Sequence, residues 1–76
     1  MFTEEEKAHL SVGLKQTLKA ISNGAVKVYV AKDTPTEIVN EITAVYSGTI
    51  EAADSMKELG RMCGIDVKAS CAALKR

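Results

Sequence analysis

The sequence predicts an α/β fold in which helices and strands alternate along one chain of 76 residues. Two observations carry this prediction. Residues 25–31, AVKVYVA, alternate valine with lysine and tyrosine, as a half-buried strand does. The segments on both sides of this strand repeat apolar residues at spacings of three and four, which is typical of amphipathic helices. Strands that alternate with helices of about ten residues favour packed layers of helix and sheet.

The first third of the chain predicts two helices separated by a short extended segment. Thr3 is expected to cap a helix that runs to about His9, because Glu6 three residues later completes a capping-box pattern. Residues 10–12 are expected to be extended. From Leu14 to Ser22 the apolar residues follow helical spacing, and Asn23-Gly24 ends this second helix.

The middle of the chain predicts the strand 25–31 and a third helix. Thr34 is expected to cap this helix, with Pro35 at its first position, and the helix ends near Ser47-Gly48. An apolar stripe runs along it. The stripe consists of Ile38, Val39, Ile42, Val45 and Tyr46.

The last third predicts a short strand, a capped helix and a final strand. Residues 50–53 form the short strand, Ser55 caps a helix that ends at Cys63-Gly64, and residues 69–74 form the final strand. No repeat, low-complexity tract or linker interrupts the chain. We therefore expect one domain over residues 1–76.

The composition excludes several classes of protein. Ten basic and ten acidic residues give zero formal net charge, which argues against nucleic-acid binding by bulk electrostatics alone. No apolar run approaches the roughly 18 residues that a membrane span needs. The chain begins with acidic residues where a signal peptide would be basic and then apolar. We expect a cytoplasmic protein that does not associate with membranes.

The sequence offers no constellation typical of catalysis. The five glycines fit neither a phosphate loop nor a dinucleotide fingerprint. His9 is the only histidine, and no nucleophile or acid accompanies it in a recognisable pattern. Cys63 and Cys71 lack the spacing of zinc ligands, and we interpret both as reduced thiols in the core. We therefore expect no enzyme, no cofactor and no metal.

The most informative segment for binding is the start of the second helix. Lys15, Gln16 and Lys19 share one side of this helix, and its apolar residues occupy the other. Unsatisfied N–H groups at a helix N-terminus attract phosphate, and Gly13 allows a nucleic-acid backbone to approach. The alternative is an ordinary solvated helix start.

Two other segments could contribute to the same site. Lys32-Asp33 follows the strand 25–31, and ligands of α/β sheets gather beyond the carboxyl ends of strands. Residues 65–68, Ile-Asp-Val-Lys, follow the last helix. Apolar residues in such a loop either pack down onto the core or offer a surface on which an unstacked base can rest.

The segments GLKQTLKAI, VYVAKD and SMKELGRMCGIDV resemble, in this order and across nearly the whole chain, the kink-turn-binding ribosomal proteins of the large subunit. These form the L7Ae and L30e family, and the chain is most similar to its short bacterial members. The resemblance implies a three-layer α/β/α sandwich with a four-stranded mixed sheet. It also implies binding to kink-turns, which are RNA duplexes sharply bent at a bulge flanked by tandem sheared G·A pairs.

The resemblance assigns RNA-binding roles to three groups of residues. Lys15 and Gln16 would face the guanine edges beside Gly13, and Lys19 would lie nearer phosphate. A second cluster would be formed by Lys32 and Asp33. The loop over the bulged nucleotides would consist of Ile65, Asp66, Val67 and Lys68.

We therefore expect a monomer that binds a structured ribosomal or regulatory RNA. Two alternatives remain open. One is a protein-interaction module on the same scaffold, in which the basic loops meet an acidic partner or a second copy. The other is a redox or small-molecule enzyme that uses Cys63, which would require a lowered thiol pKa.

Overall fold

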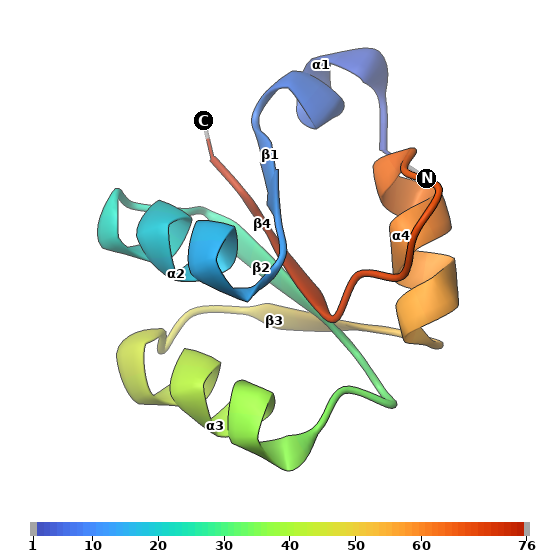
Figure 1. Ribbon diagram of the computed structural model, residues 1–76. Helices are drawn as coiled ribbons and strands as arrows, with labels where there is room; N and C mark the ends of the chain where they lie inside the picture. The colour runs from blue at the N-terminus through green and yellow to red at the C-terminus, as the bar shows by residue number, and fades with distance from the viewer. Residues whose placement is uncertain (1, 76) are drawn as a thin grey trace.

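The computed structural model describes residues 2–75, which form a four-stranded mixed sheet with helices on both faces (Figure 1). The prediction of an α/β/α sandwich is confirmed. In chain order the elements are α1 (Glu4–Ala8), β1 (Leu10–Val12), α2 (Leu14–Ser22), β2 (Lys27–Ala31), α3 (Thr36–Val45), β3 (Ile50–Ala53), α4 (Met56–Cys63) and β4 (Cys71–Leu74).

The strand order β1-β4-β2-β3 places the last strand inside the sheet. β4 pairs antiparallel with β1, where Val12 lies opposite Ala72, and with β2, where Val30 lies opposite Cys71. β3 pairs parallel with β2. The carboxyl ends of β1, β2 and β3 therefore meet the start of β4 at one edge, which we call the carboxyl edge.

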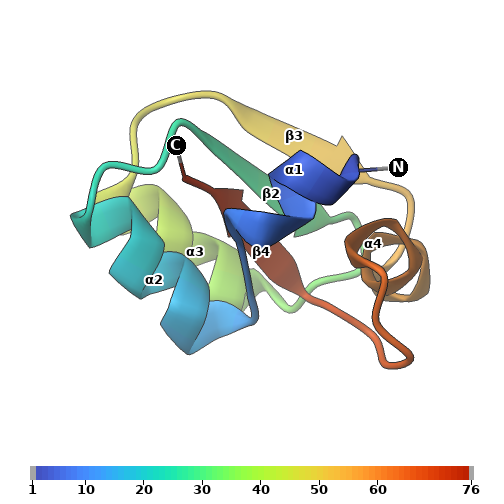
Figure 2. The ribbon, with the colours of Figure 1, turned by 90° about the horizontal axis from the view of Figure 1, so that it is seen from above.

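Two hydrophobic clusters hold the layers together, one on each face of the sheet. α2 and α3 cover one face and α4 covers the other (Figure 2). The buried side chains under α2 and α3 are Ala20, Val28, Val30, Ile42, Cys71 and Ala73. Those under α4 are Phe2, Ala31, Ala53, Leu59, Cys63, Ala69 and Ala72.

Local signals place most elements where the sequence predicts them. Thr3 and Glu6 form the complete capping box of α1, and the Oγ of Ser55 accepts from the N–H of Glu58 at the start of α4. α2 has the predicted bounds. The strands β2 and β4 each begin two residues later than predicted, at Lys27 and Cys71.

The prediction that Thr34 caps α3 is wrong. The Thr34 hydroxyl instead donates to the carbonyl oxygen of Ser70, at 2.7 Å, and Thr34 is buried. α3 begins at Thr36 after Pro35, and no side chain caps it. The hydroxyl satisfies a distant carbonyl group rather than the N–H groups of its own helix.

The predicted apolar stripe of α3 also breaks at its end. Ile42 is fully buried, whereas Val45 is 58% exposed. The helix ends at Val45, and Tyr46 packs against the core from an extended backbone conformation. Helical spacing therefore no longer applies at this point.

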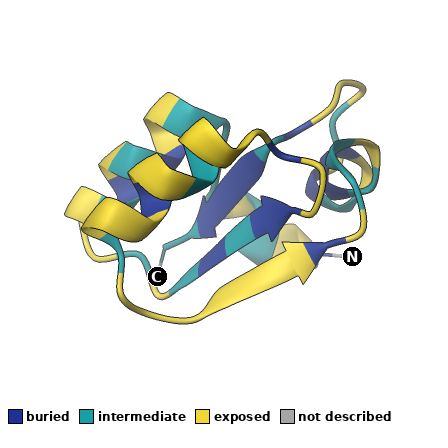
Figure 3. Cartoon of the chain, turned by 90° about the horizontal axis from the view of Figure 1, so that it is seen from below, coloured by how far each residue is buried: buried dark blue, intermediate teal, exposed yellow. Residues whose placement is uncertain are grey.

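The outer strand β3 is the least covered part of the sheet (Figure 3). Its first three residues are exposed, and only Ala53 is buried. No helix formed by residues 2–75 is long and apolar enough to cross a membrane.

Two substitutions in α3 test the observed packing of this helix. Ile42→Val should lower the free energy of unfolding by about 0.5–1.5 kcal/mol, because it removes a fully buried methylene group. Val45→Ala should change the free energy by less than about 0.5 kcal/mol, because Val45 faces solvent. Urea titrations of the two variants and the parent measure both values. Equal losses would mean that the predicted stripe, and not the observed packing, is correct.

Candidate functional site

The three segments predicted as a site meet at the carboxyl edge. The N–H of Gly13 donates to the carbonyl oxygen of Cys71, at 2.9 Å, and so joins the start of α2 to the start of β4. The carbonyl oxygen of Ser70 accepts from the N–H of Ala31, at 3.1 Å, and from Thr34. The segment that leads from loop 65–68 into β4 is therefore tied to both the β1–α2 and the β2–α3 connections.

Gly13 adopts a conformation that suits glycine. Its φ of 96° lies in the region that residues with a side chain rarely adopt, and it forms the N-cap of α2 without a side-chain hydrogen bond. The carbonyl oxygen of Gly13 accepts from the N–H of Thr17, at 2.8 Å, so the helix begins directly at the turn. The turn places the N-terminus of α2 beside the end of β1.

The exposed face of α2 carries the predicted polar residues. Lys15, Gln16 and Lys19 are exposed, while Leu14, Leu18 and Ile21 pack against the core, so the predicted division of α2 into two faces is confirmed. The first turn of α2 contains no acidic residue. Its dipole and N–H groups are therefore left to attract an external anion. Gln16 and Lys19 also line a shallow hollow of about 200 Å³ beside β1.

Lys32 and Asp33 lie beside the start of α4. Asp33 accepts from the backbone N–H of Met56 through Oδ1, at 2.7 Å, and its negative charge suits the N-terminus of this helix. The Nζ of Lys32 lies 3.7 Å from Oδ1 of Asp54, and the Lys32 side chain is 65% exposed. Asp33 thus connects the end of β2 to the start of α4.

The two apolar residues of loop 65–68 lie in different surroundings, one packed onto the core and the other exposed. Ile65 packs against the cluster under α4, as a residue folded down onto the core would. Val67 is 69% exposed, and Asp66 and Lys68 are also exposed. Gly64 ends α4 with a φ of 78°, and the N–H of Ile65 donates to the carbonyl oxygen of Gly60, the pattern of a Schellman motif.

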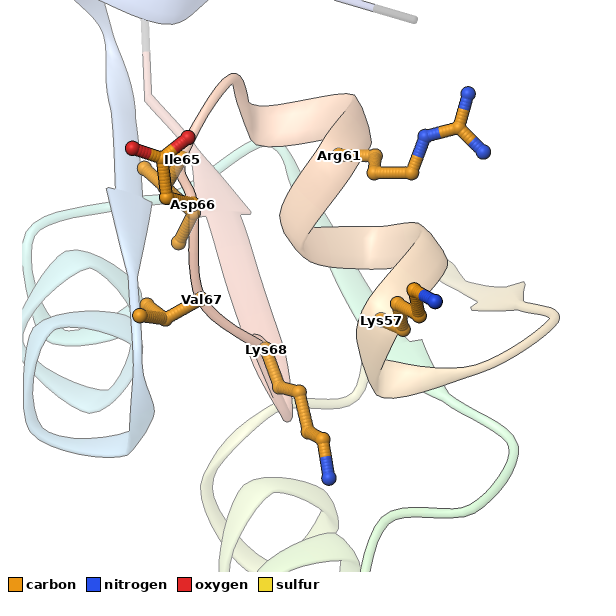
Figure 4. Close-up of a pocket in the computed structure, with 6 residues that line it drawn as sticks. All are labelled: Lys57, Arg61, Ile65, Asp66, Val67 and Lys68. Atoms are coloured by element: carbon orange, nitrogen blue, oxygen red, sulfur yellow. The ribbon is translucent and has the colours of Figure 1, made fainter.

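Two basic residues near this loop were not among the predicted site residues. Lys57 and Arg61 line an open hollow of about 870 Å³ between α4 and the loop, which we call the α4 hollow (Figure 4). Its lining consists of Lys57, Arg61, Ile65, Asp66, Val67 and Lys68. The four-residue spacing of Lys57 and Arg61 was the available signal, since residues i and i+4 share one face of a helix.

The model of the ribosomal protein L7Ae/L30e/S12e/Gadd45 family matches residues 3–76. The chain belongs to this family. It is 52% identical, over 66 residues, to an RNA-binding protein of Caldanaerobacter subterraneus; these residues cover 82% of this chain and 80% of the relative. It is 38% identical, over 69 residues, to RNA-binding protein YbxF of Geobacillus stearothermophilus, covering 86% of this chain and 84% of YbxF.

The structure is similar to that of the 15.5kD RNA binding protein of Giardia lamblia, with a TM-score of 0.80 and 26% sequence identity. The similarity covers 91% of this chain and spans 62% of the Giardia protein. The L7Ae family is not a family of enzymes, so the prediction that the chain is not an enzyme is confirmed.

The thiol of Cys63 is buried and has a raised pKa, whereas a reactive cysteine is accessible and has a lowered pKa. Cys63 and Cys71 are both buried and free, as predicted. Burial raises the pKa of the Cys63 thiol above its ordinary value of 9.0, whereas a nucleophilic cysteine needs a lowered pKa. No group of three or more His, Cys, Asp or Glu residues within 2–75 is placed to hold a metal ion.

The raised pKa of Cys63 predicts a loss of stability in alkaline solution. Well below pH 9 the thiol is protonated in both the folded and the unfolded chains, and its ionisation does not lower the free energy of unfolding. As pH rises through 9 the thiol of the unfolded chain ionises first, so the free energy of unfolding should fall until pH passes the raised pKa of the folded chain. Urea titrations between about pH 8 and pH 10 should show this fall in the parent and a smaller one in Cys63→Ala. Parallel pH profiles for the two proteins would contradict the assignment.

Gly60 allows loop 65–68 to lie against α4. Gly60 lies in the middle of α4 and is buried. A Cβ atom built on it would overlap the carbonyl oxygen of Val67. The backbone of the loop therefore occupies the space of the missing side chain. Glycine is disfavoured in helices, and its position inside a predicted helix was the signal for such a close approach.

The sign of the stability change in Gly60→Ala tests this contact. Helix propensity alone favours alanine by about 1 kcal/mol. The overlap with Val67 should outweigh this gain, since overpacking a tight contact costs about 1–3 kcal/mol. We expect a less stable variant in urea titrations, with faster amide hydrogen exchange in residues 65–69. A more stable variant would show that the loop does not depend on Gly60.

Proposed function

We propose that this chain binds RNA and recognises kink-turns through the carboxyl edge of its sheet. Membership of the L7Ae family and the relatives named as RNA-binding proteins support RNA as the ligand. The observation that carries the proposal is the hydrogen bond from Gly13 to Cys71, because it brings the start of α2 next to the segment that follows loop 65–68. Two surfaces with different chemistry thereby form one site.

Each surface suits a different part of a kink-turn. In the proposed complex Lys15 and Gln16 face the guanine edges of the sheared G·A pairs, and Lys19 lies nearer phosphate. The exposed Val67 offers an apolar surface for an unstacked base of the bulge. A straight duplex cannot place its groove on α2 and an unstacked base on Val67, so the protein selects the bent RNA.

The remaining residues complete the proposed surface without adding much net charge. Lys32 and Asp33 lie beside α4, and Ile65, Asp66 and Lys68 flank Val67. Four lysines of this surface, at positions 15, 19, 32 and 68, can neutralise at most about four phosphates, so they contribute at most roughly three to four units to the fall in log affinity per tenfold rise in salt. Shape recognition must supply the specificity, because A-form RNA offers little readable major groove.

Replacing the tandem G·A pairs by Watson–Crick pairs tests the proposal, because it keeps the phosphate charge and removes the bend. We expect the parent to lose at least tenfold in affinity, which is about 1.4 kcal/mol, in a gel-shift titration. Gln16→Ala should bind the kink-turn more weakly and distinguish the two RNAs less well, because it loses contacts to the G·A pairs. Equal affinity of the parent for both RNAs would show that the chain does not recognise kink-turns.

A further inference from the structure

The pairing of charges within residues 2–75 separates the cations into two groups. Four of them form ion pairs with acidic side chains, namely Lys7, Lys27, Lys32 and Arg61. Five lysines in the same range form none, namely Lys15, Lys19, Lys57, Lys68 and Lys75. Lys15 and Lys19 belong to the proposed α2 contact, whereas Lys57 and Lys68 line the α4 hollow on the other side of loop 65–68.

Three cations line the open α4 hollow. Lys57 and Arg61 project from successive turns of α4, about 6 Å apart along the helix axis, and Lys68 extends from the neighbouring loop (Figure 4). Asp66 is the one acidic residue of the lining. The Nη1 of Arg61 lies 3.3 Å from Oε2 of Glu58, but both side chains are exposed, and such a pair is worth less than about 1 kcal/mol. A phosphate can therefore compete for Arg61.

We propose that the α4 hollow is a second RNA contact, in which Lys57, Arg61 and Lys68 bind phosphates of the strand that carries the bulge. This inference rests on the proposed function. An RNA whose groove lies on α2 and whose bulged base reaches Val67 must continue past loop 65–68. Lys57 and Arg61 on α4 then lie beside its backbone, and the side chains around them offer no amide or hydroxyl that would select a particular base.

A double-mutant cycle between protein and RNA tests this contact. Lys57→Ala and Lys68→Ala should each weaken binding to a kink-turn RNA about two- to fivefold, the range of an exposed charge pair. Each should also reduce the dependence of log affinity on log salt by about 0.7–0.9. Methylphosphonates in the bulged strand remove the phosphate charge, so on that RNA these variants should bind like the parent. Abasic nucleotides in the bulge keep the phosphates, so there the losses should remain.

Two further variants sharpen the result. Lys27→Ala serves as the control, because Lys27 begins β2 at the opposite edge of the sheet and pairs with Glu51; its RNA affinity should not change. Glu58→Gln releases Arg61 and should bind the kink-turn about twofold more tightly.

The outcomes distinguish this inference from the proposed function. If the parent prefers the kink-turn to its Watson–Crick counterpart but Lys57→Ala and Lys68→Ala bind with parental affinity, the α4 contact is wrong and kink-turn recognition stands. Losses that persist on the methylphosphonate RNA would also overturn the contact, because they could not arise from phosphate. A parent that does not distinguish the two RNAs would overturn both.

Discussion

The position of β4 between β1 and β2 is the constraint on which the rest of the structure depends. Cys71, Ala72 and Ala73 are fully buried and lie alternately against the two hydrophobic clusters. Their small side chains let α2 and α4 approach the sheet from opposite faces. The same strand begins at the carboxyl edge, where the carbonyl oxygen of Cys71 holds the turn before α2. One short strand therefore closes the core and positions the proposed RNA surface.

Backbone groups, more than side chains, place the residues of the proposed surface. The carbonyl oxygen of Ser70 is held by Thr34 and by the N–H of Ala31, and the carbonyl oxygen of Val67 fills the space beside Gly60. Backbone contacts of this kind leave the exposed side chains available for a ligand. The contacts that fix the loop are made by its backbone, and substitutions of exposed side chains leave them in place. Such a surface can therefore vary in its side chains while its shape is kept.

Zero net charge is compatible with the proposed RNA binding because the charges of this protein are not evenly paired. The paired Lys27 lies away from the proposed surface, and the paired Lys32 lies within it. Four lysines that form no ion pair within residues 2–75 lie on α2, on α4 and in loop 65–68. A molecule of this kind has little long-range attraction for nucleic acid, which limits non-specific binding. Its affinity must then come from contacts that only a ligand of the right shape can make simultaneously, such as those of Val67 and the start of α2.

The sequence alone determined the fold class, most element boundaries and the two faces of α2, because these follow from local caps and helical spacing. It also pointed to the three segments of the proposed surface, through glycine and lysine positions and a family resemblance. Only the tertiary structure decided the rest. Thr34 bonds to a carbonyl group 36 positions away, Val45 is exposed where its helix ends, and Lys57 shares a hollow with Lys68. Each of these features depends on which segments that are distant in the sequence pack together in the fold. A local sequence pattern does not specify such long-range packing.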